Sequence, residues 1–314
     1  MGAERRDEAT AADRHGGLAQ PTTERGTSEA EASNAASPGP GATSATERMR
    51  APAFLGESAR RFAESGVPPA TPRLAATVVL MRPGEVAYEV FLQRRAATMA
   101  FAPNMYAFPG GSVDPRDAET PPAWTGPAPE RWAARLGLPE PEARAVVCAA
   151  VREVFEECGV LLAGPDPATV VGDVAGDEWE SARAALVAHE LSLVDFLTER
   201  GLAVRSDLLA GWARWLTPDF EPRRYDTYFF LARLPVGQVT RDVGGEAAHA
   251  LWALPGDLAG GDAQMLPPTR VTLRQLAAYP DVDAAMSGAA GRDARTVLMP
   301  TISLDGAPIL HVPI

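Results

Sequence analysis

The chain has 314 residues, and all 29 of its basic residues are arginine, against 41 acidic residues and a net charge of −12. This acidic balance argues against a general nucleic-acid-binding surface, and the absence of lysine excludes enzymes that depend on a phosphate-binding or catalytic lysine. No run of about 18–20 apolar residues could span a membrane and the N-terminus lacks the apolar core of a signal peptide, so we expect a soluble, cytoplasmic protein.

The distribution of bulky apolar residues divides the chain into a tail, a linker and a domain. Residues 1–50 contain almost none of them, which is the composition of a disordered tail. Residues 51–69 are expected to form a linker with a short helix. A single folded domain then runs from residue 70 to residue 314.

The first predicted element of this domain is a β-hairpin. Leu74 to Met81 is β-prone and apolar, Arg82 to Glu85 is a turn, and Val86 to Gln93 alternates between apolar and polar residues. Downstream, Tyr106 to Asp114 predicts a short strand that runs into a tight glycine turn.

The segment from Val151 to Val160 predicts a helix with one acidic and one apolar face. Glu153, Glu156 and Glu157 stand at positions i, i+3 and i+4, which lie side by side on a helix. Apolar residues occupy the opposite face, and a glycine ends the helix. Carboxylates crowded in this way form either an ordinary solvated face or a cation site, and oxygen ligands suit Mg²⁺ or Mn²⁺.

The two cysteines, Cys148 and Cys158, fall in this same predicted helix. Ten residues at about 1.5 Å each place them roughly 15 Å apart, beyond the reach of a disulfide. No cysteine–histidine cluster predicts a zinc site. None of the four histidines has a motif around it, so none is counted among the candidate site residues.

The remaining chain predicts helices followed by strands. Glu178 to Trp215 has helical periodicity and indicates two or three helices, with Ser192 and Ser206 as N-caps. Trp212 and Trp215 are interpreted as the packed end of the last helix. The later predicted elements are a strand from Tyr225, a strand at Ala250–Trp252, a helix from Pro267 to Tyr279 and a hairpin over Thr296–Ile314. This alternation predicts an α/β fold.

Together, the glycine turn and the acidic helix resemble the signature of the Nudix hydrolases, G-x5-E-x7-R-E-U-x-E-E-x-G-U, in which U is bulky and apolar. Residues 152–160 match every specified position of its second half. Gly111, within Phe108-Pro109-Gly110-Gly111, matches its start. However, Arg152 follows Gly111 by 41 residues instead of the fourteen of the signature.

The intermediate glutamate of the signature has no true match, because it falls on Asp117 or on Arg144 according to the end from which one counts. A signature split in this way resembles that of the Nudix branch related to the coenzyme A diphosphatases. In that branch an insertion separates the glycine turn from the catalytic helix. The resemblance implies an α/β/α sandwich with a curved mixed β-sheet over residues 70–314. It places insertions at about 115–145 and 178–215.

The family resemblance also implies the roles of the signature residues. Glu153, Glu156 and Glu157 would bind Mg²⁺ or Mn²⁺, with Glu157 or Glu156 serving alternatively as the catalytic base. Arg152 would orient these glutamates through a salt bridge.

Further residues would contact the substrate. Gly110 and Gly111 would let the backbone approach the metal and the phosphates. Arg94, which follows the predicted hairpin, would grip a phosphate, since a guanidinium can do so bidentately; its alternative is a solvated arginine. Arg223, Arg224 and Glu246 are additional candidates, the last as a base or metal ligand or as an ordinary loop glutamate.

The implied activity is hydrolysis of a diphosphate bond in a small-molecule, nucleoside-diphosphate-linked substrate. Coenzyme A or acyl-coenzyme A is the substrate expected for this branch. NADH, ADP-ribose, nucleotide sugars and dinucleoside polyphosphates are alternatives, as is a non-catalytic nucleotide-binding module. Because many relatives dimerise, the resemblance also allows a homodimer.

Overall fold

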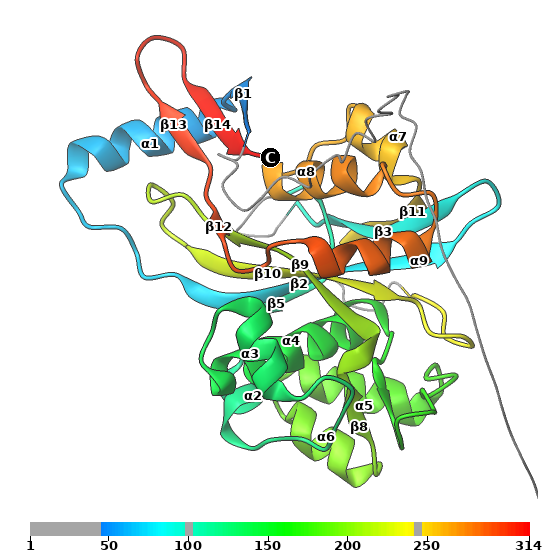
Figure 1. Cartoon of the computed structure of the whole chain (residues 1–314). Coiled ribbons are helices and arrows are strands. Elements are labelled where there is room, and N and C mark those ends of the chain that lie inside the picture. Colours follow the sequence, from blue (N-terminus) through cyan, green and yellow to red (C-terminus); the bar gives the residue numbers. More distant parts are fainter. Residues whose placement is uncertain (1–44, 98–102, 242–246) are drawn as a thin grey trace, which may run out of the picture. The chain divides into compact units, whose positions relative to one another are not determined.

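The computed structural model describes residues 45–97, 103–241 and 247–314, which contain a mixed eight-stranded sheet (Figure 1). Six strands lie in the order β11-β3-β2-β10-β9-β12, while β4 pairs with β3 and β5 with β2. The β2–β10 and β9–β12 pairs are parallel and the others antiparallel. The strands are β2 (Arg73–Pro83), β3 (Tyr88–Arg95), β4 (Tyr106–Ala107), β5 (Gly110–Ser112), β9 (Leu209–Leu216), β10 (Tyr225–Arg233), β11 (Ala247–Ala253) and β12 (Val297–Leu298).

The sheet buries both of its faces, as β2 shows most clearly. Val78 and Leu80 belong to one apolar core, whereas Val79 and Met81 belong to the other. Successive side chains of a strand point to opposite faces, so a strand covered on both sides is apolar throughout. The α/β sandwich predicted from the sequence is therefore confirmed.

Helices form the two outer layers of the sandwich (Figure 1). One layer contains α2 (Pro115–Glu119), α3 (Pro129–Leu136), α4 (Glu140–Cys158), α5 (Asp177–Val187) and α6 (Leu193–Glu199), with a small sheet of β6 (Trp124–Thr125), β8 (Ala203–Arg205) and β7 (Ala163–Gly164). The other contains α1 (Ala53–Ser65), α7 (Pro255–Gly260), α8 (Pro267–Leu276) and α9 (Val282–Gly288), with a sheet of β1 (Thr46–Arg50), β14 (Ile309–Pro313) and β13 (Thr301–Ser303). Short 3₁₀ turns lie at Ser206–Leu208 and Ala289–Gly291.

The acidic helix predicted from the sequence is the second half of α4. Its apolar face is fully buried at Val151, Val154, Phe155 and Cys158. Gly159 has a φ of 67°, and its N–H donates to carbonyls of the last turn. A left-handed glycine of this kind satisfies backbone carbonyls that a helix end leaves unpaired, so the predicted helix and its C-terminus are confirmed.

The predictions for the two hairpins and for the N-terminal tail have different outcomes. The hairpins β2–β3 and β13–β14 form as expected. The predicted tail, however, extends too far, because Thr46–Arg50 is strand β1 and pairs antiparallel with β14. Its partner lies at the opposite end of the chain, so local composition carries no sign of this strand. Residues 1–44 lie outside the described part of the chain.

The prediction of helix up to Trp215 is wrong, because β9 begins at Leu209. The β9–β10 register shifts so that Gly211 pairs with Phe230 but Ala213 with Phe229, which leaves Trp212 as an extra residue in a β-bulge. A bulge changes which face the following side chains point to. Trp212 and Trp215 consequently pack in the same core. Their spacing of three residues is the same as that of side chains on one face of a helix.

The α5–α6 segment, residues 177–199, contains the two helices expected upstream. Ser192 caps α6 by accepting from the Asp195 N–H (3.1 Å), as predicted, whereas Ser206 begins a 3₁₀ turn without a side-chain cap. In the part of the chain that the structure describes, no helix is both long enough and apolar enough to span a bilayer.

Candidate active site

The glycine turn and the acidic helix meet where β5 packs against α4. The Gly110 N–H donates to Glu157 Oε2 (3.0 Å). A Cβ atom on Gly111 would lie 2.5 Å from Glu153 Oε1. A Cβ atom on Gly110 would lie 2.4 Å from the Ala76 carbonyl oxygen. Both separations are far below van der Waals contact, so a side chain at Gly110 would clash with backbone and one at Gly111 would displace the Glu153 carboxylate. The two halves of the split signature therefore lie side by side.

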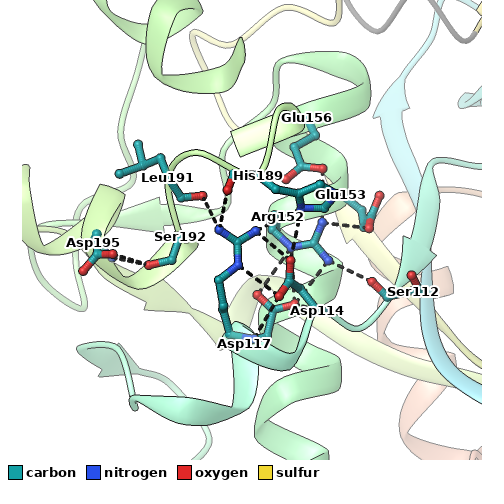
Figure 2. Close-up of polar contacts among 11 residues, drawn as sticks. Ser112, Asp114, Asp117, Arg152, Glu153, Glu156, His189, Leu191, Ser192 and Asp195 are labelled. Carbon is teal, nitrogen blue, oxygen red and sulfur yellow. Dashed lines mark hydrogen bonds and ion pairs between the residues drawn. The ribbon is translucent and has the colours of Figure 1, made fainter. Parts of the chain in front are cut away.

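Arg152 is the centre of a buried network of ion pairs (Figure 2). Its Nη1 donates to Glu153 Oε1 (2.8 Å) and Glu156 Oε2 (3.1 Å). Its Nε lies 3.3 Å from each carboxylate oxygen of Asp117. Its Nη2 donates to Asp117 Oδ2 (3.2 Å) and to the Ser112 carbonyl (2.9 Å). One guanidinium thus pairs with carboxylates from two separate segments, α2 and α4.

Asp117 supplies the acidic partner for which the sequence offered no true match. It lies in the first turn of α2, where the Asp114 side chain accepts from the Arg116 N–H (2.9 Å) and Asp117 Oδ2 accepts from the Asp114 N–H (3.0 Å). This capping box directs Asp117 back toward α4, where the residue is 2% exposed. Arg144, the other alternative, pairs with Glu140 instead (3.5 Å).

Burial controls the electrostatics of this cluster. It raises the pKa of Glu153 to about 7, and it also raises the pKa values of Glu156 and Asp117. Burial alone would lower the pKa of Arg152, but the surrounding carboxylates raise it above its usual value. Glu153 and Glu156 are each only 8% exposed and Glu157 is partly exposed, so two of the three carboxylates do not belong to a solvated face.

The donor set of the cluster fits a hard cation at Glu156. Its Oε1 is buried and has no hydrogen-bond partner among the described residues. A buried carboxylate oxygen without a partner is energetically unfavourable, and a divalent cation would satisfy it. Within the described residues, no three acidic, histidine or cysteine side chains are already arranged around a common metal position. Arg152 donates hydrogen bonds to Glu153 Oε1 and to Glu156 Oε2, so these two oxygens already have partners.

The α5–α6 segment also contacts the acidic helix, which no sequence motif indicated. Arg183 Nη1 donates to the Glu156 carbonyl oxygen (2.7 Å) in the last turn of α4. Arg116 Nη1 donates to the His189 carbonyl (3.0 Å) and reaches the Leu191 carbonyl (3.4 Å), which joins this segment to α2. The only local signal is the i,i+3 spacing of Glu180 and Arg183, which form an ion pair on α5.

The remaining candidate residues lie outside this cluster. Arg94 is exposed on β3 and its Nε donates to the Asn104 carbonyl (3.2 Å). Arg223 is exposed. Arg224 is buried, with Nε donating to the Thr217 carbonyl (3.1 Å), Nη1 to the Ala70 carbonyl (3.0 Å) and Nη2 paired with Asp219 (2.5 Å). Glu246 lies outside the described residues. Both cysteines are buried and free, as expected.

A glycine turn facing a helix with Arg-Glu-x-x-Glu-Glu, on an α/β sandwich, has the fold and site of a Nudix-type hydrolase. The crystal structure of a Nudix hydrolase from Alicyclobacillus acidocaldarius is similar, with a TM-score of 0.58 and 32% sequence identity, covering 69% of this chain and 96% of that one. The chain belongs to the Nudix hydrolase family.

Further similarities concern one branch of this family. The family model for the NUDT19 Nudix domain matches residues 118–261. Acyl-coenzyme A diphosphatase NUDT19 from Xenopus laevis is 25% identical over 203 residues, or 54% of this chain and 53% of that protein. Its counterpart from Homo sapiens is 29% identical over 209 residues, or 54% and 52%. The chain spans about half the length of these curated relatives, and the resemblance to this branch is confirmed.

Proposed function

We propose that this protein is a diphosphatase that uses Mg²⁺ or Mn²⁺ to hydrolyse a diphosphate bond in coenzyme A or acyl-coenzyme A. The observation that carries the proposal is the unpartnered Oε1 of Glu156, buried beside a glycine turn and a second oriented carboxylate. The choice of substrate is supported by the acyl-coenzyme A diphosphatases among the relatives.

In the proposed mechanism, Glu153, Glu156 and Glu157 would hold the cation. When bound, it would neutralise phosphate charge and lower the pKa of a water molecule. Arg152 keeps Glu153 and Glu156 in one orientation, so that little reorganisation accompanies reaction. One of the three glutamates, Glu157 or Glu156, would instead serve as the base that accepts the proton of the attacking water.

Other groups of the chain would bind the substrate. Gly110 and Gly111 let the β5 backbone pack directly against Ala76 and Glu153, and this turn would bring backbone groups close to the metal and the phosphates. Arg94 is exposed and available to pair with a phosphate. Water would add to one phosphorus and the bridging oxygen would leave with the other phosphate, giving 4′-phosphopantetheine and 3′,5′-ADP from coenzyme A.

The test measures Mg²⁺- or Mn²⁺-dependent hydrolysis of coenzyme A, acetyl-coenzyme A, NADH, ADP-ribose and a nucleotide sugar. Wild type is compared with Glu156→Gln and Glu157→Gln, and with Glu142→Gln as a matched control, since Glu142 is exposed at the other end of α4. We expect both active-site variants to lose at least about 100-fold in kcat/KM and the control to retain wild-type activity.

The outcomes separate mechanism from substrate. Preferred cleavage of another compound, lost in both active-site variants, would preserve the mechanism and overturn the substrate. Folded protein without metal-dependent turnover of any compound would overturn the enzymatic proposal and favour a nucleotide-binding module.

A further inference from the structure

His189 has a backbone conformation that a histidine seldom adopts. It follows α5 with a φ of 58°, in the left-handed region. This turn lets the Glu190 N–H donate back to the Ala185 carbonyl (2.8 Å). Glycine is the usual residue at such a position, because a Cβ atom makes this backbone conformation unfavourable. A residue kept there at this cost suggests that its side chain has a function.

Arg116 holds the His189 ring in place through Nδ1. Arg116 Nη2 lies 2.9 Å from His189 Nδ1, and Asp114 Oδ2 lies 3.2 Å from the same nitrogen. Arg116 is itself anchored by Asp114 (2.7 Å) and by the His189 carbonyl (3.0 Å). With Nδ1 engaged, Nε2 is the ring nitrogen left without a partner among the described residues, and the side chain is 68% exposed.

This ring lies beside the carboxylate cluster of α4. Asp114, its neighbour, caps the helix that carries Asp117, and Asp117 pairs with Arg152. A continuous series of polar contacts through Asp114, Asp117 and Arg152 thus links His189 to Glu156. The α5–α6 segment therefore brings one exposed ring nitrogen to the edge of the proposed diphosphate site.

We propose that His189 contacts the substrate, with Nε2–H donating to a non-bridging oxygen of the diphosphate. When Nδ1 accepts from Arg116, the neutral ring carries its proton on Nε2, so this donor requires no change of charge. The inference deepens the proposed diphosphatase function and rests on it. It assigns a binding residue to a segment without any sequence motif, and Arg116 becomes the residue that positions it.

The test is His189→Gly, because glycine suits the left-handed backbone and removes only the ring. We expect KM for the preferred substrate to rise about 10-fold, as for loss of one hydrogen bond to a charged group, with an unchanged or raised unfolding midpoint. The inhibition constant of inorganic pyrophosphate should rise by the same factor. Glu190→Gln is the control on the same exposed turn and should remain within about twofold of wild type.

Each other result would overturn the inference. Wild-type KM in His189→Gly would show that the ring does not bind substrate. A higher KM with unchanged inhibition by pyrophosphate would place the contact away from the diphosphate. A lower unfolding midpoint would make the ring structural. Absence of turnover in wild type, in contrast, would remove the proposed function, and this inference with it.

Discussion

Arg152 and Arg224 are both buried arginines that the sequence nominated for the site, yet their surroundings differ. Arg152 is 5% exposed and meets the carboxylates of Asp117, Glu153 and Glu156. Arg224 is 7% exposed and meets two backbone carbonyls and Asp219, which is half-exposed. A guanidinium that donates to backbone carbonyls links the loops that carry them. A guanidinium surrounded by buried carboxylates instead marks a place where charge is concentrated. The partners of a buried arginine, more than its burial, therefore distinguish a chemical site from a structural contact.

The largest effect is expected for Arg152→Met. Removing the guanidinium leaves three buried carboxylates without a counter-charge, which costs about 3–5 kcal/mol of unfolding free energy. Loss of carboxylate orientation should lower kcat/KM at least about 100-fold. Urea unfolding and steady-state kinetics measure the two effects. Mg²⁺ or Mn²⁺ should raise the urea midpoint of this variant more than that of wild type, and equal shifts would contradict a cation site among these carboxylates.

Asp117→Asn should have the next largest effect. Asparagine has nearly the same shape but removes the charge that pairs with Arg152, so we expect kcat/KM to fall about 10-fold. The unfolding free energy should change less than in Arg152→Met, because burial already disfavours the charged form of Asp117 and raises its pKa. Glu119→Gln, on the exposed end of the same helix, is the control. Wild-type kinetics in Asp117→Asn would mean that the network does not need this partner.

Arg183→Met tests the contact between the α5–α6 segment and the acidic helix. It removes the hydrogen bond to the Glu156 carbonyl (2.7 Å), which should reduce the unfolding free energy by about 1–3 kcal/mol. We expect a smaller loss of kcat/KM, about threefold, because the backbone of Glu156 moves while its side chain keeps Arg152. Arg131→Met, on the exposed side of α3, serves as the control. An unchanged kcat/KM would limit Arg183 to a stabilising role.

Arg224→Met should have the smallest effect on activity. The variant leaves the Thr217 and Ala70 carbonyls without their donor, so the unfolding free energy should fall by about 1–3 kcal/mol. Kinetics of the folded protein should remain within about twofold of wild type, since the guanidinium already has partners at all three nitrogens. A KM increase comparable to that of His189→Gly would instead place Arg224 in contact with substrate and remove the contrast with Arg152.

Much of the fold could be predicted where the signal is local. The β2–β3 hairpin follows from two β-prone segments around a turn, and the end of α4 follows from Gly159. The prediction of a helix up to Trp215 failed because the bulge at Trp212 lets Trp212 and Trp215, three residues apart on β9, pack in the same core. Periodicity reports which residues share a face, and a bulged strand and a helix can share the same period.

The site, like the fold, could be predicted where the signal lies within a short stretch of sequence. Glu153 and Glu156 share a face of α4 because of their spacing, and the family signature identified Arg152 and the glycine turn. Asp117 could be nominated only by counting from Gly111. His189 has no motif, and its conformation is evident only from the turn after α5.

By itself, the sequence determined which side chains share one face of the acidic helix, since 3.6 residues per turn fix that arrangement wherever the helix lies. It also determined that the turn at Gly110 and Gly111 has no side chains, which permits close packing of its backbone. Only the tertiary structure decided that Asp117 pairs with Arg152 and that the α5–α6 segment reaches the same cluster. The free energy of closing a loop depends only weakly on its length, so the number of intervening residues does not specify which segments meet; packing of the apolar faces on the sheet does.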